Sequence, residues 1–243
     1  MKVHIPQLRK LYKTQFIFRL FVLAFTIIMY FTYPKSFTVM EGLNFFNKLS
    51  WLHILWVIWV IDVFHKFIPT RKYISLGSVK HLKEFYKPIR KLFDKTELLN
   101  LIKKGRFDAL KVMVIWIGII IIIGVLQANR LLKLKDLLLI SVIFYVLDLM
   151  FVLFWCPFRV WILRNRCCTT CRIFNWDHMM MFSPLLFSPG FFSFSLFFLG
   201  ILELIIWELC FFLHPERFFE ETNAELRCNN CIDKLCGNKN CKL

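Results

Sequence analysis

Long, nearly uninterrupted apolar runs dominate the hydropathy pattern of this chain. An α-helix needs about 20 apolar residues to cross the roughly 30 Å of hydrocarbon in a bilayer. Five runs approach or reach this length, at residues 16–33, 49–67, 112–127, 137–155 and 191–213. The single charge of the first run, Arg19, lies near its start, and we expect its long side chain to reach the interface. The pattern predicts five transmembrane helices.

A further apolar stretch, residues 179–190, contains Pro184 and Pro189 and cannot be a regular helix throughout. At about 3.3 Å per residue it is long enough to cross the hydrocarbon core as a broken or partly extended limb. Alternatively, it dips into the bilayer and returns to the same side. A crossing limb places the C-terminal tail on the same side as the N-terminus, and this is the arrangement that we expect.

The predicted fold is an all-α polytopic membrane protein. It has about five transmembrane helices, a broken or re-entrant Pro-containing segment, basic interfacial helices and a Cys-rich cytoplasmic tail. The chain divides into a basic N-terminal segment (1–15), a first transmembrane hairpin (16–67), a basic amphipathic cytoplasmic loop (68–111), a second transmembrane hairpin (112–155), a Cys-containing connector (156–178), the broken segment with the last transmembrane helix (179–213) and a Cys-rich tail (214–243).

Composition and charge agree with a membrane location. Apolar residues make up 58% of the chain and 29 residues are Phe, whereas soluble domains are about 45–50% apolar. The net charge of +16 is concentrated between the apolar runs, since residues 66–111 hold 13 Lys or Arg against 4 Asp or Glu. Cytoplasmic segments carry this excess. We therefore expect a multi-pass cell-membrane protein with both termini in the cytoplasm and no specific nucleic-acid binding.

The basic loop has an internal apolar pattern. Val79, Leu82, Phe85, Ile89 and Leu92 recur at helical spacing among lysines and arginines. This pattern predicts an interfacial helix, kinked or divided at Pro88. Its expected partner is the lipid bilayer, with attraction to anionic lipids, or else it is a solvated surface that fixes topology.

The cysteines predict a metal site on the cytoplasmic side, where thiols stay reduced. Two C-x2-C pairs and two further cysteines can supply a tetrahedral sulfur site for zinc or iron, or hold an iron–sulfur cluster. The metal is then either a structural clip or an electron carrier. Alternatively, the first pair exchanges electrons with the tail cysteines by thiol–disulfide exchange, and a membrane quinone or another redox partner accepts the electrons. The candidate ligands are Cys168, Cys171, Cys228, Cys231, Cys236 and Cys241.

Acidic residues within the apolar runs form a second group of candidates. Asp148 and Glu203 lie deep in their runs, where a charge is costly, and they can serve a proton path, an intramembrane metal site or a site for a polar headgroup or quinone. Hydrogen bonding between helices is the alternative. We assign that structural role to Asp62, which shares a helical face with His65.

Asp177 and His178 follow the first cysteine pair. They can orient a thiolate site from its second shell, or act as acid and base at the membrane surface. Helix capping is the alternative role.

The sequence leaves three functions open. The first is a membrane protein with the cysteine metal site, and the second is a thiol-disulfide oxidoreductase coupled to quinone. The third is a small transporter or lipid-modifying enzyme that uses the intramembrane carboxylates. Nucleotide-binding, lipase and zinc-protease motifs are absent from the sequence, and the residues do not establish whether the protein is an enzyme.

Overall fold

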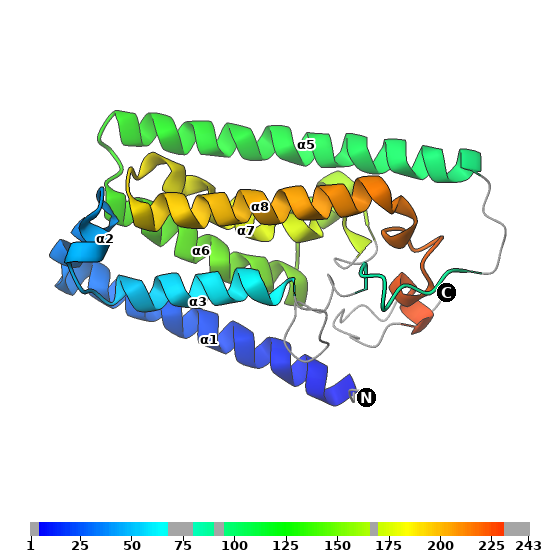
Figure 1. Cartoon of the computed structure of the whole chain (residues 1–243), viewed down its shortest axis with the longest axis horizontal. Helices are drawn as coiled ribbons and strands as arrows, with labels where there is room; N and C mark the ends of the chain where they lie inside the picture. The colour runs from blue at the N-terminus through cyan, green and yellow to red at the C-terminus, as the bar shows by residue number, and fades with distance from the viewer. Residues whose placement is uncertain (1–4, 68–79, 90–94, 166–169, 231–243) are drawn as a thin grey trace.

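The computed structural model of the chain describes residues 5–67, 80–89, 95–165 and 170–230. Within these residues the fold is helical, with two isolated β-bridges and no strand (Figure 1). The longest helices are α1 (Ile5–Thr32), α3 (Leu52–His65), α5 (Lys95–Ala128), α6 (Leu134–Leu153) and α8 (Phe191–Leu213). The shorter ones are η1 (Pro34–Met40), α2 (Asn44–Asn47), η2 (Phe158–Leu163), η4 (Phe174–Trp176), α7 (Asp177–Phe182), η5 (Ser183–Phe187), η6 (Pro215–Arg217), η7 (Ala224–Leu226) and η8 (Cys228–Asn230).

Four helices are long and apolar enough to cross a membrane: most of α1 (Lys10–Thr32), α5, α6 and α8. This confirms the predicted helical, membrane-type fold. The predicted span 49–67 is wrong in its length, because its helix α3 has 14 residues, or about 21 Å at 1.5 Å per residue. The chain before it folds as η1 and α2 at the end of the bundle. Helix α3 begins at Leu52 and ends at His65, inside the predicted bounds at both ends.

The predicted interfacial helix is also wrong for residues 80–89. These residues form turns and a single bridge between Pro88 and Asn223. Pro88 has no backbone N–H to continue a helical ladder, and the Ile89 amide donates to the Thr222 carbonyl instead. The helical part of the basic segment begins later, at Lys95, and continues without a break into the apolar half of α5.

Residues 177–190 form the broken limb that the prolines predicted. Helix α7 gives way to η5, which has Pro184 in its first turn, and Ser188 follows in an extended conformation. The limb then reaches the end of the bundle at which α8 begins, where the Gly42 amide donates to the Pro189 carbonyl at 2.8 Å. Because the limb runs back along the bundle, α6 and α8 point in the same direction (Figure 1).

The described tail lies at the end of the bundle where α5 begins and α3 ends (Figure 1). The Ala224 amide donates to the Lys87 carbonyl at 2.9 Å, and the Asn223 side chain donates to the Lys80 carbonyl at 3.0 Å. The Cys-containing connector after α6 also starts at this end. The described parts of the connector and of the tail therefore lie at the same end of the bundle.

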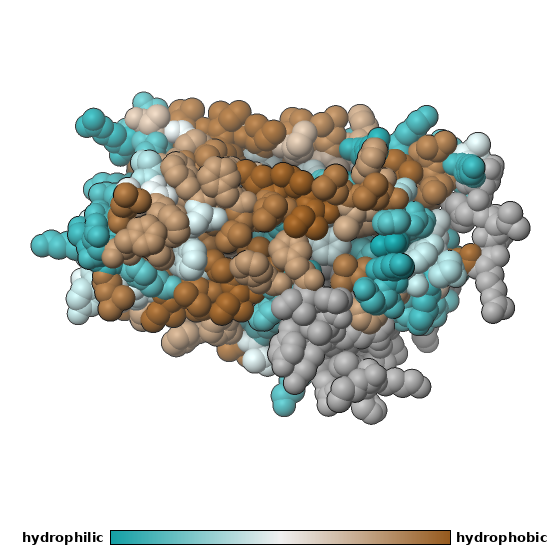
Figure 2. Space-filling view, viewed as in Figure 1, coloured by the Kyte–Doolittle hydropathy of each residue, from teal (hydrophilic) through white to brown (hydrophobic). Residues whose placement is uncertain are grey.

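The core and the outer surface are both apolar. Trp59 is fully buried and packs edge-on against the Phe182 ring, at 5.5 Å between centroids. Large apolar side chains of α1 and α5 face outward, among them Phe21 at 67% exposed and Ile122 at 61%. Figure 2 shows apolar residues across the middle of this face of the molecule and hydrophilic residues at its two ends, a distribution compatible with a membrane protein.

Candidate functional site: a buried charge chain

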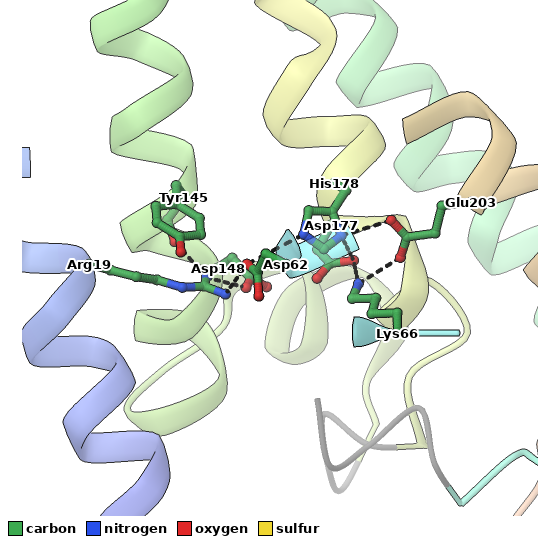
Figure 3. Close-up of polar contacts among 8 residues, drawn as sticks. All are labelled: Arg19, Asp62, Lys66, Tyr145, Asp148, Asp177, His178 and Glu203. Carbon is green, nitrogen blue, oxygen red and sulfur yellow. Dashed lines mark hydrogen bonds and ion pairs between the residues drawn. The ribbon is translucent and has the colours of Figure 1, made fainter. Parts of the chain in front are cut away.

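Seven ionisable side chains from five helices meet inside the bundle (Figure 3). Acids contact bases throughout, and a 3.9 Å contact between His178 Nδ1 and Asp177 Oδ1 closes a ring through Glu203 and Lys66. We call this set the charge chain, and in order of contact its members are Asp148, Arg19, Asp62, His178, Glu203, Lys66 and Asp177.

Arg19 of α1 holds the first part of the charge chain together. Its Nη1 donates to Asp148 Oδ2 of α6 at 2.7 Å, and its Nη2 donates to Asp62 Oδ2 of α3 at 3.3 Å. The guanidinium also lies 4.0 Å from the centre of the Tyr145 ring, a favourable cation–π arrangement. Arg19 is 8% exposed and points into the bundle. The expectation that it reaches the interface is therefore wrong, because carboxylates on two neighbouring helices pair with it.

Lys66, which follows the last residue of α3, holds the other part. Its ammonium group binds Asp177 Oδ1 of α7 and lies 2.9 Å from Glu203 Oε1 of α8. Lys66 is 3% exposed and Glu203 is 1% exposed. A primary ammonium has three donors, so it can serve carboxylates on two elements at once.

His178 of α7 joins the two parts. Its Nδ1 lies 2.7 Å from Glu203 Oε2, and its Nε2 lies 3.5 Å from Asp62 Oδ2. The same Asp62 oxygen accepts from Arg19. The imidazole therefore connects the Arg19 group to the Lys66 group, and it is 3% exposed.

The charge chain has more acids than fixed cations. Four carboxylates face Arg19 and Lys66, so their formal sum is −2 with a neutral imidazole and −1 with an imidazolium. Excess buried charge is unfavourable at low dielectric. A proton or another cation bound among these groups relieves the imbalance.

Glu203 shows where such a partner fits. Both of its oxygens lie within ion-pair distance of a nitrogen, yet neither contact has hydrogen-bond angles. The Lys66 ammonium at 2.9 Å and the His178 ring at 2.7 Å still attract the carboxylate, because Coulomb energy depends on separation. The angles show that the acceptor positions of this buried carboxylate are not satisfied by aligned protein donors.

Two pockets reach the charge chain from different sides. One, of about 220 Å³, lies between α1 and α3, with Gln15, Arg19, Asp62 and His65 among its lining residues. The other, of about 270 Å³, is lined by α5, α6, the connector and α7, and Asp148 and Asp177 lie on its wall. We call them the α1–α3 pocket and the α5–α7 pocket.

Asp177, His178 and Glu203 also have the spacing of a metal site, with one ligand atom from each within 4.8 Å of the others. The Lys66 ammonium, however, binds Asp177 and lies beside Glu203. A divalent ion would have to displace this buried cation. We therefore interpret the three residues as part of the charge chain.

The structure brings together four of the residues proposed from the sequence: Asp148, Glu203, Asp177 and His178. The last two lie on α7 next to Glu203, because α7 packs closely against α8 at Gly200. Asp62 does bond between helices, as expected, but to Arg19 and His178. Sequence reasoning missed the roles of Arg19 and Lys66. One feature of the sequence could have indicated these roles: neighbouring apolar runs carry both basic and acidic residues, which can pair with each other.

The cysteine predictions fall mostly outside the described residues. This applies to Cys168, Cys231, Cys236 and Cys241, and the structure does not describe the side chain of Cys228. Cys171 is buried, at 8% exposed, in a small cluster with Ala109, Val112, Leu163 and Ile173. Cys156 is also buried. The six-cysteine metal site stays a prediction.

Comparison with known proteins does not supply a family. No family model, curated protein sequence or solved structure matches this chain.

Proposed function

We propose that this protein is a small membrane carrier whose charge chain exchanges protons as a solute binds. One observation carries the proposal: His178 links two ion-paired groups in which four carboxylates outnumber two fixed cations. Proton relays in membrane transporters are built from such buried Asp, Glu and His residues.

A purely structural role explains the charge chain less well. Replacing a buried ion pair by apolar residues of similar volume is often neutral or stabilising. Ion pairing alone also needs equal numbers of acids and bases, and this site has an excess of acids. Its members are in addition open to pockets on two sides.

The geometry supports a proton route through the imidazole. A histidine can accept a proton on one ring nitrogen and release one from the other, and the two His178 nitrogens face Glu203 and Asp62. Asp62 also lines the α1–α3 pocket with Gln15 and His65. We infer that protons enter here, from the end of the bundle that carries the basic loop.

Nuclear magnetic resonance of the imidazole nitrogens tests this proposal. The chain has 6 histidines, and a His178→Gln variant assigns the signal of His178 in ¹⁵N-histidine-labelled protein in lipid nanodiscs. We expect His178 to change protonation state within the pH range in which the protein stays folded. We also expect Asp148→Asn to shift that change, although Asp148 contacts His178 only through Arg19 and Asp62.

Asp108→Asn is the matched control, because Asp108 pairs with Lys111 on α5, outside the charge chain. It should leave the His178 titration where it is in the unmodified protein. An imidazole that keeps one protonation state throughout the folded range, or that responds equally to both variants, contradicts the proposal.

A second proposal concerns the predicted cysteine centre. A site shared by Cys171 and the tail cysteines needs connector and tail at one end of the bundle, and the described parts of both lie there. We propose a zinc or iron centre that fixes the tail. Elemental analysis should find the metal in stoichiometric amount and find it lost in Cys171→Ser. Metal-free protein with a reducible Cys168–Cys171 bond would instead favour the thiol-disulfide oxidoreductase.

A further inference from the structure

We propose that the α5–α7 pocket binds an organic cation with an apolar body. The inference rests on the proposed function, since the two carboxylates on the pocket wall, Asp148 and Asp177, are members of the charge chain. It adds the chemical class of the solute.

Most of the pocket surface is apolar and aromatic. Trp116 and Ile119 of α5 face Phe144 and Phe151 of α6, and Met180 of α7 adds a thioether. Trp116 is held in place by a 3.1 Å hydrogen bond from its Nε1 to Ser183 Oγ. Apolar walls with a few fixed polar groups are typical of small-molecule sites, and aromatic faces attract cations.

The polar groups of this pocket are acidic. Lys, Arg and His are absent from the described residues that line it, whereas Asp148 and Asp177 are present. The side chains of these two acids are 26% and 15% exposed, and those of their partners Arg19 and Lys66 are 10% and 4% exposed. The partner cations approach from within the bundle, so each carboxylate keeps a side that faces the pocket.

Charge balance favours a cation over other occupants. The charge chain has a formal excess of negative charge, which a cation between Asp148 and Asp177 reduces. An acyl chain of a bilayer lipid would fill the apolar part but leave this excess in place. An anionic headgroup would add to it.

Protons and the solute should therefore compete. Binding of a cation lowers the demand of the two carboxylates, and of the titratable and charged groups around them, for protons. Tyr145 of α6 is one of these groups, since its ring lies under the guanidinium of Arg19. The others are Arg19 of α1, Asp62 and Lys66 of the α3 region, His178 of α7 and Glu203 of α8.

Equilibrium dialysis with radiolabelled benzyltrimethylammonium tests the inference. The full chain is placed in nanodiscs of zwitterionic phosphatidylcholine, and empty nanodiscs measure partition into lipid. We expect saturable binding of one probe per chain that weakens in more acidic buffer. Neopentylbenzene has the same shape without the charge, and it should displace the probe far less well than unlabelled benzyltrimethylammonium does.

Variants of α5 locate the site without altering a charge. Ile119→Trp fills the pocket and should weaken binding by about tenfold or more, which corresponds to roughly 1.4 kcal/mol or more. Ile122→Trp is the matched control, because Ile122 is 61% exposed on the same helix and does not line the pocket. Asp148→Asn should also weaken binding about tenfold, and Ile119→Trp keeps the test valid if that variant does not fold.

Each outcome decides the inference. Binding that matches empty nanodiscs, that is equal in Ile119→Trp and Ile122→Trp, or that neopentylbenzene displaces as well as the cation does, overturns it. If His178 titrates but the probe does not bind, the proton-exchange proposal stands and the proposal of an organic cation as solute is rejected. Probe binding with a non-titrating His178 would retain the cation site and remove proton exchange.

Discussion

Replacing Lys66 by Met is the sharpest test of the energetics of the charge chain. Lys66 is 3% exposed and its Nζ lies 2.9 Å from Glu203 Oε1. At an effective dielectric constant of about 20, one pair at this separation attracts by roughly 6 kcal/mol. Removing one partner of a buried pair costs about 3–5 kcal/mol in practice, because the remaining charge stays buried. We therefore expect Lys66→Met to lower the free energy of unfolding by about 3–5 kcal/mol.

Lys111→Met on α5 is the control. Lys111 also lies 2.9 Å from a carboxylate, that of Asp108, but its side chain is 43% exposed. Exposed pairs contribute about 0–1 kcal/mol, so the control should change little. Unfolding of the protein in mixed micelles by a denaturing detergent, followed by Trp fluorescence, measures both values. Equal losses in the two variants would refute the claim that burial decides the cost.

The single variant Glu203→Gln and the double variant Lys66→Met/Glu203→Gln complete the cycle. Removing the second charge eliminates the unpaired carboxylate that Lys66→Met leaves at Glu203. The double variant should therefore be more stable than Lys66→Met alone, with a coupling energy of about 0.5–3 kcal/mol. Additive losses would show that the two residues do not interact.

Three further predictions concern other contacts. Arg19→Lys replaces a fork that bonds two carboxylates by a point charge, so unfolding should require about 1.5–3 kcal/mol less in the detergent assay; an unchanged value contradicts the paired geometry. Gly200→Ala places a Cβ 3.2 Å from the α7 backbone and should cost about 1–3 kcal/mol, whereas Gly118→Ala meets open space and should not destabilise. Asn223→Ala removes bonds that hold residues 80–89, so hydrogen exchange at the Ile89 amide should quicken; unchanged protection would mean that other contacts hold this segment.

Hydropathy predicts the helical membrane-type fold because lipid forces backbone polar groups to pair within each span. It also identifies Asp148 and Glu203, since a charge in an apolar run is conspicuous. Arg19 and Lys66 lie near the predicted ends of their runs, where a long side chain has two solutions: reaching water or reaching a buried carboxylate. The direction that each side chain takes depends on acidic residues of other helices. The hydropathy of a single segment carries no information about those residues.

The position of Asp177 and His178 depends on packing over a long sequence distance. In the sequence they follow Cys171, which favoured a role beside the cysteines. In the structure α7 lies against Gly200, where the absence of a side chain allows the α7 backbone to come close. Glu203 lies three residues further along the same face of α8, and its Oε2 is 2.7 Å from His178 Nδ1. A glycine in an apolar helix is consistent with close packing, but the sequence does not say which segment packs there.

The contacts that connect Asp148 to His178 give a physical reason why binding in one pocket should affect protonation at the other. A cation bound at Asp148 competes with Arg19 for that carboxylate, and Arg19 can then give more of its charge to Asp62, which it already contacts at 3.3 Å. Asp62 in turn becomes a weaker partner for His178 at 3.5 Å, so the imidazole holds its proton less tightly. Asp62 lines the α1–α3 pocket, which we propose as the route of the released proton. In the proposed carrier, alternating charges that share partners would thus couple solute binding on one side to proton release on the other.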